Sequence, residues 1–97
     1  MSYEKSIRSL MTPERLRSYL SNREEDLPIL ETAFEKKDFE AIKATAHRVK
    51  GGAPVFGFDE LAKISIEMET AAKSADLNAL RASIDNTRSE FDLKFLR

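Results

Sequence analysis

Apolar residues recur every three or four positions along almost the whole of this chain, which is the spacing of one face of an α-helix. No segment alternates apolar and polar residues for long enough to form a convincing strand. Only three glycines and three prolines interrupt 97 residues that are otherwise rich in good helix formers. The clearest apolar face comprises Phe39, Ile42, Ala46, Val49, Ala53 and Phe56. The sequence therefore predicts an all-α protein.

The N-terminal third carries several signals for the start of a helix. A short helix is expected over Tyr3–Met11, after which Thr12-Pro13 restarts the chain, because threonine caps helices well and proline suits the first helical position. Asn22, with Glu25 three residues on, resembles a second capping pair. Pro28 is expected to kink the helix around it. The sequence leaves open whether residues 13–37 form one bent helix or two.

The remaining helices follow from cap and turn residues. Asp38 is expected to cap a helix that Gly57 ends, and Asp59 is expected to cap the next one. A turn near residues 74–76 leads to a last helix that begins around Leu77. Short connections between helices of similar length favour an antiparallel four-helix bundle. We expect residues 1–97 to form a single domain of this kind, with the short N-terminal helix covering the bundle.

The charge balance limits the classes of partner. Sixteen basic against 17 acidic residues give a formal net charge of -1, whereas a general nucleic-acid binder should carry a basic excess. The chain has no cysteine, and no apolar run approaches the roughly 20 residues that a membrane span needs. The first residues lack the apolar core of a signal peptide. We therefore expect a cytoplasmic protein, or a cytoplasmic fragment of a longer one, that binds neither nucleic acid nor membrane.

The only histidine and all three glycines fall between residues 47 and 57. His47 follows the apolar position Ala46 by one step, about 100° around the helix axis, so it is expected to face solvent. A neutral imidazole has one nitrogen with a free lone pair, which makes it a nucleophile near neutral pH. Lys43 and Lys50, one turn to either side, could supply positive charge for an attacked phosphoryl group. Gly51 removes bulk from the face of His47, whereas Gly52 points nearer the bundle and favours close helix packing.

His47 and the adjacent glycines could also be ordinary structural residues. By default a solitary exposed histidine is only a surface residue, and two neighbouring glycines could mark no more than a kink. A metal site is disfavoured because the chain has no second histidine, no cysteine and no carboxylate at the positions neighbouring His47 on its helix. A hydrolase triad has no support beyond the presence of serines. The glycine-rich loop of nucleotide-binding proteins is absent, and no cofactor is expected.

The segment Ala46-His47-Arg48-Val49-Lys50-Gly51, followed by Gly57, resembles the signature of histidine phosphotransfer (HPt) domains. In that signature a histidine, any residue, an apolar residue, lysine and glycine precede a second glycine six residues later. Residues 50–58 are especially similar to the phosphotransfer domain of the chemotaxis histidine kinase CheA. Leu61 and Met68-Glu69 also match the next helix of that family. The resemblance covers residues 12–97 in helix pattern and residues 46–69 in motif.

The resemblance implies a role for each matching residue. His47 would be phosphorylated, Lys50 would stabilise the phosphoryl group, and Gly51 would leave room for a partner. Glu69 would accept a hydrogen bond from Nδ1 of the imidazole, which would leave Nε2 as the nucleophile. Pro54 departs from the small or polar residue usual in the family, and it would delete a helical hydrogen bond to the carbonyl of Lys50.

The function implied is that of a phosphoryl carrier in two-component signalling. His47 would receive the group from a kinase catalytic domain or a phosphorylated receiver and pass it to a receiver aspartate, and the receiver would bring the Mg²⁺. The domain would be a monomeric intermediate rather than an independent enzyme, with Arg48 and Lys43 contributing to partner access. Two alternatives stay open: the excised domain of a chemotaxis-type kinase, and a helical adapter whose His47 is never phosphorylated.

Overall fold

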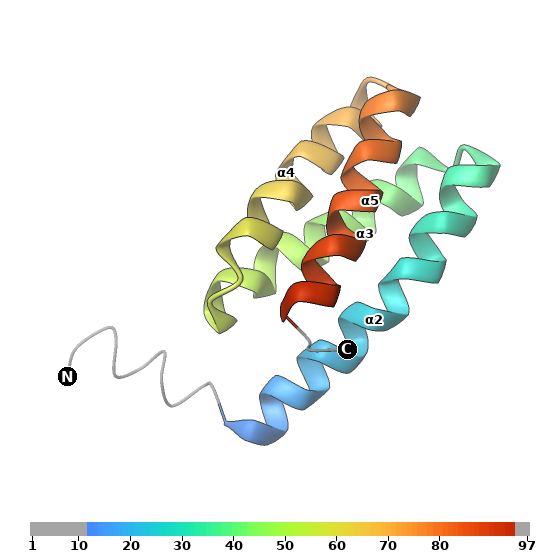
Figure 1. Cartoon of the computed structure of the whole chain (residues 1–97). Helices are drawn as coiled ribbons and strands as arrows, with labels where there is room; N and C mark the ends of the chain where they lie inside the picture. The colour runs from blue at the N-terminus through green and yellow to red at the C-terminus, as the bar shows by residue number, and fades with distance from the viewer. Residues whose placement is uncertain (1–11, 95–97) are drawn as a thin grey trace.

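The computed structural model describes residues 12–94, and these residues fold into a bundle of helices that run alternately up and down (Figure 1). In chain order they are α2 (Pro13–Lys36), α3 (Phe39–Gly52), the 3-10 helix η1 (Ala53–Phe56), α4 (Asp59–Lys73) and α5 (Leu77–Lys94). The predicted all-α, antiparallel four-helix bundle is confirmed, and the short covering helix expected over Tyr3–Met11 lies outside the described residues. Within residues 12–94, no helix has both the length and the hydropathy that crossing a bilayer requires.

The question left open for residues 13–37 is answered by one long helix, α2. The Thr12 hydroxyl accepts a hydrogen bond from the backbone N–H of Arg15 at 3.2 Å, and Lys37, with a φ of 56°, ends the helix. The second capping pair expected at Asn22 is wrong, because the helix continues through it. Pro28 also lies inside α2. Buried side chains on both sides of Pro28, Asp26 and Leu30, hold the helix against the bundle.

Helix α3 ends earlier than the sequence suggested. Asp38 caps its start as expected, since its carboxylate accepts a hydrogen bond from the N–H of Ala41. The α-helix stops at Gly52 and continues as the 3-10 turn η1, which Gly57 ends with a φ of 79°. Pro54 explains the change, because it cannot donate the hydrogen bond that an α-helix would direct to the carbonyl of Lys50.

The start of α4 differs from the expectation in one detail. Asp59 is its first residue rather than its cap, and Phe58 occupies the cap position without a side-chain hydrogen bond to the helix. An acidic residue in the first turn still suits the positive end of the helix dipole. The carboxylate of Asp76 makes the side-chain contact expected of a cap before α5, by accepting a hydrogen bond from the N–H of Ala79.

The core lies along the apolar faces that the sequence identified. Helix α3 packs most extensively against α4, and α4 in turn packs against α5. One cluster of buried residues fills the middle of the bundle: Leu30, Ala33, Ile42, Ala46, Met68, Ala71, Ala72, Leu80 and Ile84. A second cluster lies nearer η1 and comprises Val49, Ala53, Leu61 and Phe91. The buried face of α3 fixes which of its residues point outward.

Candidate functional site

His47 projects from the outer face of α3, as the sequence predicted. Its neighbour Ala46 is almost completely buried, whereas the His47 side chain is 71% exposed. One step along an α-helix turns the chain by about 100°, so the packing of Ala46 directs His47 away from the core. An imidazole with this exposure can be reached by a second macromolecule without opening the bundle.

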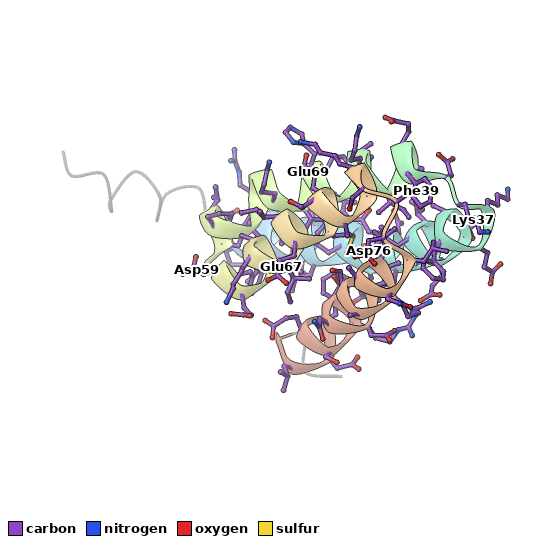
Figure 2. The ribbon with its side chains drawn as sticks, turned by 90° about the horizontal axis from the view of Figure 1, so that it is seen from above. Lys37, Phe39, Asp59, Glu67, Glu69 and Asp76 are labelled. Carbon is purple, nitrogen blue, oxygen red and sulfur yellow. The ribbon has the colours of Figure 1, made fainter. Side chains whose placement is uncertain are left out.

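Glu69 from α4 joins two residues of α3 through one carboxylate. Its Oε2 lies 3.4 Å from Nδ1 of His47, and its Oε1 accepts a hydrogen bond of 2.9 Å from Nζ of Lys50. Glu69 lies on the side of α4 that faces α3, whereas Glu67 lies on the other side (Figure 2). The distance to Nδ1 is slightly longer than an ordinary N–H···O bond, and such contacts at reactive sites commonly tighten when a substrate binds. The structure thus brings His47, Lys50 and Glu69 together, three residues that the sequence grouped.

The charge on Glu69 is held by its neighbours. The hydrogen bond and the positive charge of Lys50 lower the pKa of the Glu69 carboxyl below its ordinary value, and His47 contributes in the same direction. Partial desolvation opposes this effect, because the side chain of Glu69 is only 19% exposed. Glu69 is therefore ionised at neutral pH and can accept a hydrogen bond from Nδ1–H of His47. This contact favours the tautomer whose lone pair lies on Nε2.

The two adjacent glycines have opposite surroundings. Among the described residues, a Cβ added at Gly51 would meet nothing within 4 Å, whereas one added at Gly52 would lie 2.9 Å from Cε1 of Tyr19. The Tyr19 ring, which also stacks on Phe56 with centroids 4.5 Å apart, occupies the space that a side chain at Gly52 would need. The prediction that Gly52 permits close packing is confirmed. Gly51 leaves the surface beside His47 open.

Lys43 lies near the site, but an acidic neighbour holds its ammonium group. Its Nζ is 3.2 Å from Oε1 of Glu40, one turn earlier on α3. The side chains of Glu40 and Lys43 line a shallow cavity of about 320 Å³, together with Ala44, His47 and Glu69. The part that Glu40 plays in neutralising Lys43 was not foreseen from the sequence. Of these two lysines, Lys50 is the one that contacts Glu69, the carboxylate that also lies beside His47.

Arg48 points toward α2 and meets a buried carboxylate. Its Nη2 donates a hydrogen bond of 3.3 Å to Oδ1 of Asp26, and Oδ2 of the same residue lies 2.7 Å from Nε of Arg23. The Asp26 side chain is only 4% exposed, while that of Arg48 is 55% exposed. Asp26 and Arg23 were not predicted from the sequence. A signal was present, since residues 19, 23, 26, 30 and 33 step by four and three along α2, which places two charged residues on its inner face.

The chain is similar to a known domain family and to one phosphorelay protein. The family model described as "Hpt domain" matches residues 14–93. The phosphorelay intermediate protein rdeA of Dictyostelium discoideum is 30% identical over 84 residues, which cover 87% of this chain and 33% of that protein. The chain therefore spans about a third of the length of this relative. No solved structure matches. With the family model covering nearly all the described residues, the chain belongs to the Hpt domain family.

Proposed function

We propose that this domain is a histidine phosphotransfer carrier of a phosphorelay, and that His47 is the residue phosphorylated. Membership of the Hpt family supports the reaction class. The observation that carries the assignment to His47 is its position: the only histidine of the chain is 71% exposed and lies within 3.4 Å of an ionised carboxylate. Gly51, one turn away, leaves the approach open.

The proposed step is a displacement at phosphorus by Nε2. Its lone pair forms the N–P bond while the bond from phosphorus to the leaving group breaks and takes its electron pair with it. The proton on Nδ1 stays on the ring and faces Oε2 of Glu69, whose negative charge stabilises the positive charge that develops on the imidazole. Lys50 supplies positive charge near the oxygens of the phosphoryl group. Glu69 and Lys50 thus serve orientation and charge, and His47 forms the covalent bond.

The partners follow from this chemistry. The donor is either a kinase catalytic domain that uses ATP or a phosphorylated receiver domain, and the acceptor is a receiver aspartate. We place the Mg²⁺ and most catalytic groups on the receiver, so that this domain is a monomeric carrier rather than an independent enzyme. Gly51, Arg48 and Lys43 lie on or beside the His47 face and are proposed to admit and contact the partner. Such partners act in the cytoplasm, where we place the reaction.

The similarity of residues 50–58 to the phosphotransfer domain of CheA supports a finer proposal. Lys50, Gly51 and Gly57 belong to the general HPt signature, so the likeness to CheA rests on the whole run of residues 50–58. On this basis the chain would be the excised phosphotransfer domain of a chemotaxis-type kinase, phosphorylated by the catalytic domain of that kinase. The length of the native open reading frame would separate this origin from a free-standing relay protein, and phosphotransfer profiling against the kinases and receivers of the source organism would identify the partners.

The central test is whether phosphate enters at His47. Incubation with a cognate kinase and ATP, or with a phosphorylated receiver, should give an acid-labile and base-stable adduct. The variant His47→Gln should lose the label while circular dichroism shows an intact bundle. Label that persists in this variant, or that resides on serine, would overturn the proposal. A domain that binds its partner but is never labelled would be a helical adapter.

A further inference from the structure

One carboxylate at this site has two partners on α3. Glu69 contacts Nδ1 of His47 through Oε2 and Nζ of Lys50 through Oε1. Lys50 is therefore already paired with Glu69 in the unphosphorylated domain. Its side chain is 34% exposed, so it can move without disturbing buried groups.

A phosphoryl group on His47 would change the balance of charge around Lys50. It carries a charge of about −1.5 to −2 at neutral pH, against −1 for the Glu69 carboxylate. His47 and Lys50 are three residues apart on α3, so their side chains share one face of the helix. At comparable separation the phosphoryl oxygens attract the ammonium about 1.5 to 2 times as strongly as the carboxylate does, and the positive charge of the protonated ring reduces this difference.

We propose that Lys50 exchanges partners when His47 is phosphorylated, leaving Glu69 and binding the phosphoryl oxygens, so that competition between the two anions sets the lifetime of the phosphohistidine. The inference rests on the proposed function and adds a regulatory role for the Lys50–Glu69 ion pair. Glu69 keeps the Nδ1–H as its partner after the exchange. Lys43 pairs with Glu40 at 3.2 Å and forms no ion pair with Glu69 in the part of the chain that the structure describes, so it takes no part in this exchange.

The exchange can be tested with a chemical phosphoryl donor, so that no cognate kinase is needed. In phosphoramidate, attack by Nε2 forms the N–P bond while ammonia departs with the electron pair of the broken P–N bond. The wild-type domain and Lys50→Ala are compared at neutral pH, before and after this reaction. The chemical shift of the Glu69 carboxyl carbon and the ³¹P shift of the phosphohistidine are the two readouts.

We expect Lys50→Ala to affect Glu69 before phosphorylation and the phosphohistidine after it. Before phosphorylation, Lys50→Ala should change the shift of the Glu69 carboxyl carbon, and after phosphorylation this difference from wild type should largely disappear. In the phosphorylated domain the same substitution should change the ³¹P shift. If His47 is phosphorylated but the carboxyl shift stays equally sensitive to Lys50, the exchange is wrong while the proposed function stands. If His47 takes no phosphoryl group from any donor, the proposed function itself fails.

The lifetime of the phosphohistidine provides a second test. Glu69→Gln removes the competing anion, so the adduct should decay about two- to fivefold more slowly, the range that an exposed ion pair can supply. Glu67→Gln, which alters an exposed glutamate on the other side of α4, is the matched control and should leave the lifetime unchanged. The effect of Glu69→Gln should be smaller in the Lys50→Ala background. An equal effect in both backgrounds would show that Lys50 plays no part.

Discussion

Arg48 on α3 donates a hydrogen bond to the buried carboxylate of Asp26 on α2, although its sequence neighbour His47 faces solvent. Two adjacent residues of one helix therefore serve different contacts. Arg48 attaches α3 to α2, and this attachment helps to fix the rotation of the helix that presents His47. The pair is unequal, because Asp26 is buried and Arg48 is more than half exposed.

This inequality predicts the order of two variants. Asp26→Ala would leave Arg23, whose side chain is 11% exposed, without its ion pair and should lower the free energy of unfolding by about 3 kcal/mol or more. Arg48→Ala removes a partly solvated group and should cost at most about 1 kcal/mol. Urea denaturation followed by circular dichroism measures both values. A larger loss for Arg48→Ala would show that Asp26 depends on Arg48 rather than on Arg23.

Alanine at each of the two adjacent glycines should shift stability in opposite directions. Gly51→Ala should raise the free energy of unfolding by a few tenths to about 1 kcal/mol, because the position is helical and open. Gly52→Ala should lower it by about 1–3 kcal/mol, because the new Cβ would press on the Tyr19 ring. Thermal melts of the two variants under one set of conditions provide the comparison. Equal effects at both positions would contradict the assignment of different roles.

A bulky residue at Gly51 should impair transfer without harming the fold. Gly51→Gln places a long side chain in open space beside His47, so the partner's approach to Nε2 should be hindered while the melting temperature changes little. The rate of phosphotransfer to a receiver should fall more than the rate with phosphoramidate, which is far smaller than a protein partner. Loss of both rates together with thermal stability would mean that the glycine is structural.

An ion-pair network between α2 and α5 should make stability depend on pH in the acidic range. The hydrogen bond from Arg81 to Glu31, at 3.1 Å between Nη1 and Oε2, lowers the pKa of that carboxyl, and Arg88 adds to the effect. Because this pKa is lower in the folded state than in the unfolded chain, the network stabilises the fold at pH values above the unfolded value of about 4.3. The contribution is then lost as the pH falls through the folded pKa.

Glu31→Gln should therefore reduce stability at pH 7 and flatten the decline of stability below about pH 5. Urea denaturation at a series of pH values tests this expectation. Glu35→Gln, at an exposed position of the same helix, serves as the control and should leave the pH profile unchanged. A profile of Glu31→Gln that remains parallel to wild type would assign the acid sensitivity to other carboxylates.

The sequence was sufficient for the bundle and for the outward direction of His47, since both follow from helical spacing. The buried residues Ile42, Ala46 and Val49 are the ones that the apolar face of α3 selected. The end of this helix was misplaced because the hydrogen bond that Pro54 cannot make outweighs the apolar spacing that continues to Phe56. The capping pair predicted at Asn22 does not start a new helix, because packing along α2 outweighs a local capping signal.

The site was only partly predictable for a different reason. Helical spacing placed Lys50 beside His47, but Glu69 was added from resemblance to a family, because residues on α3 and α4 have no spacing rule that connects them. Local spacing could have shown the contact of Lys43 with Glu40, three residues away on the same helix, but not that of Lys50 with Glu69 on another helix. Asp26 could have been suspected from its place on the inner face of α2, but its partner Arg48 lies 22 residues further along the chain.

The contact between Gly52 and the Tyr19 ring also has a consequence for how this domain can vary. The two positions share a single volume, so a residue larger than glycine at 52 requires a smaller or displaced residue at 19. Among homologues, changes at these positions should therefore occur together. Gly51 shares no such volume with any of residues 12–94, so its variation should follow the shape of the partner surface and should be independent of residue 19.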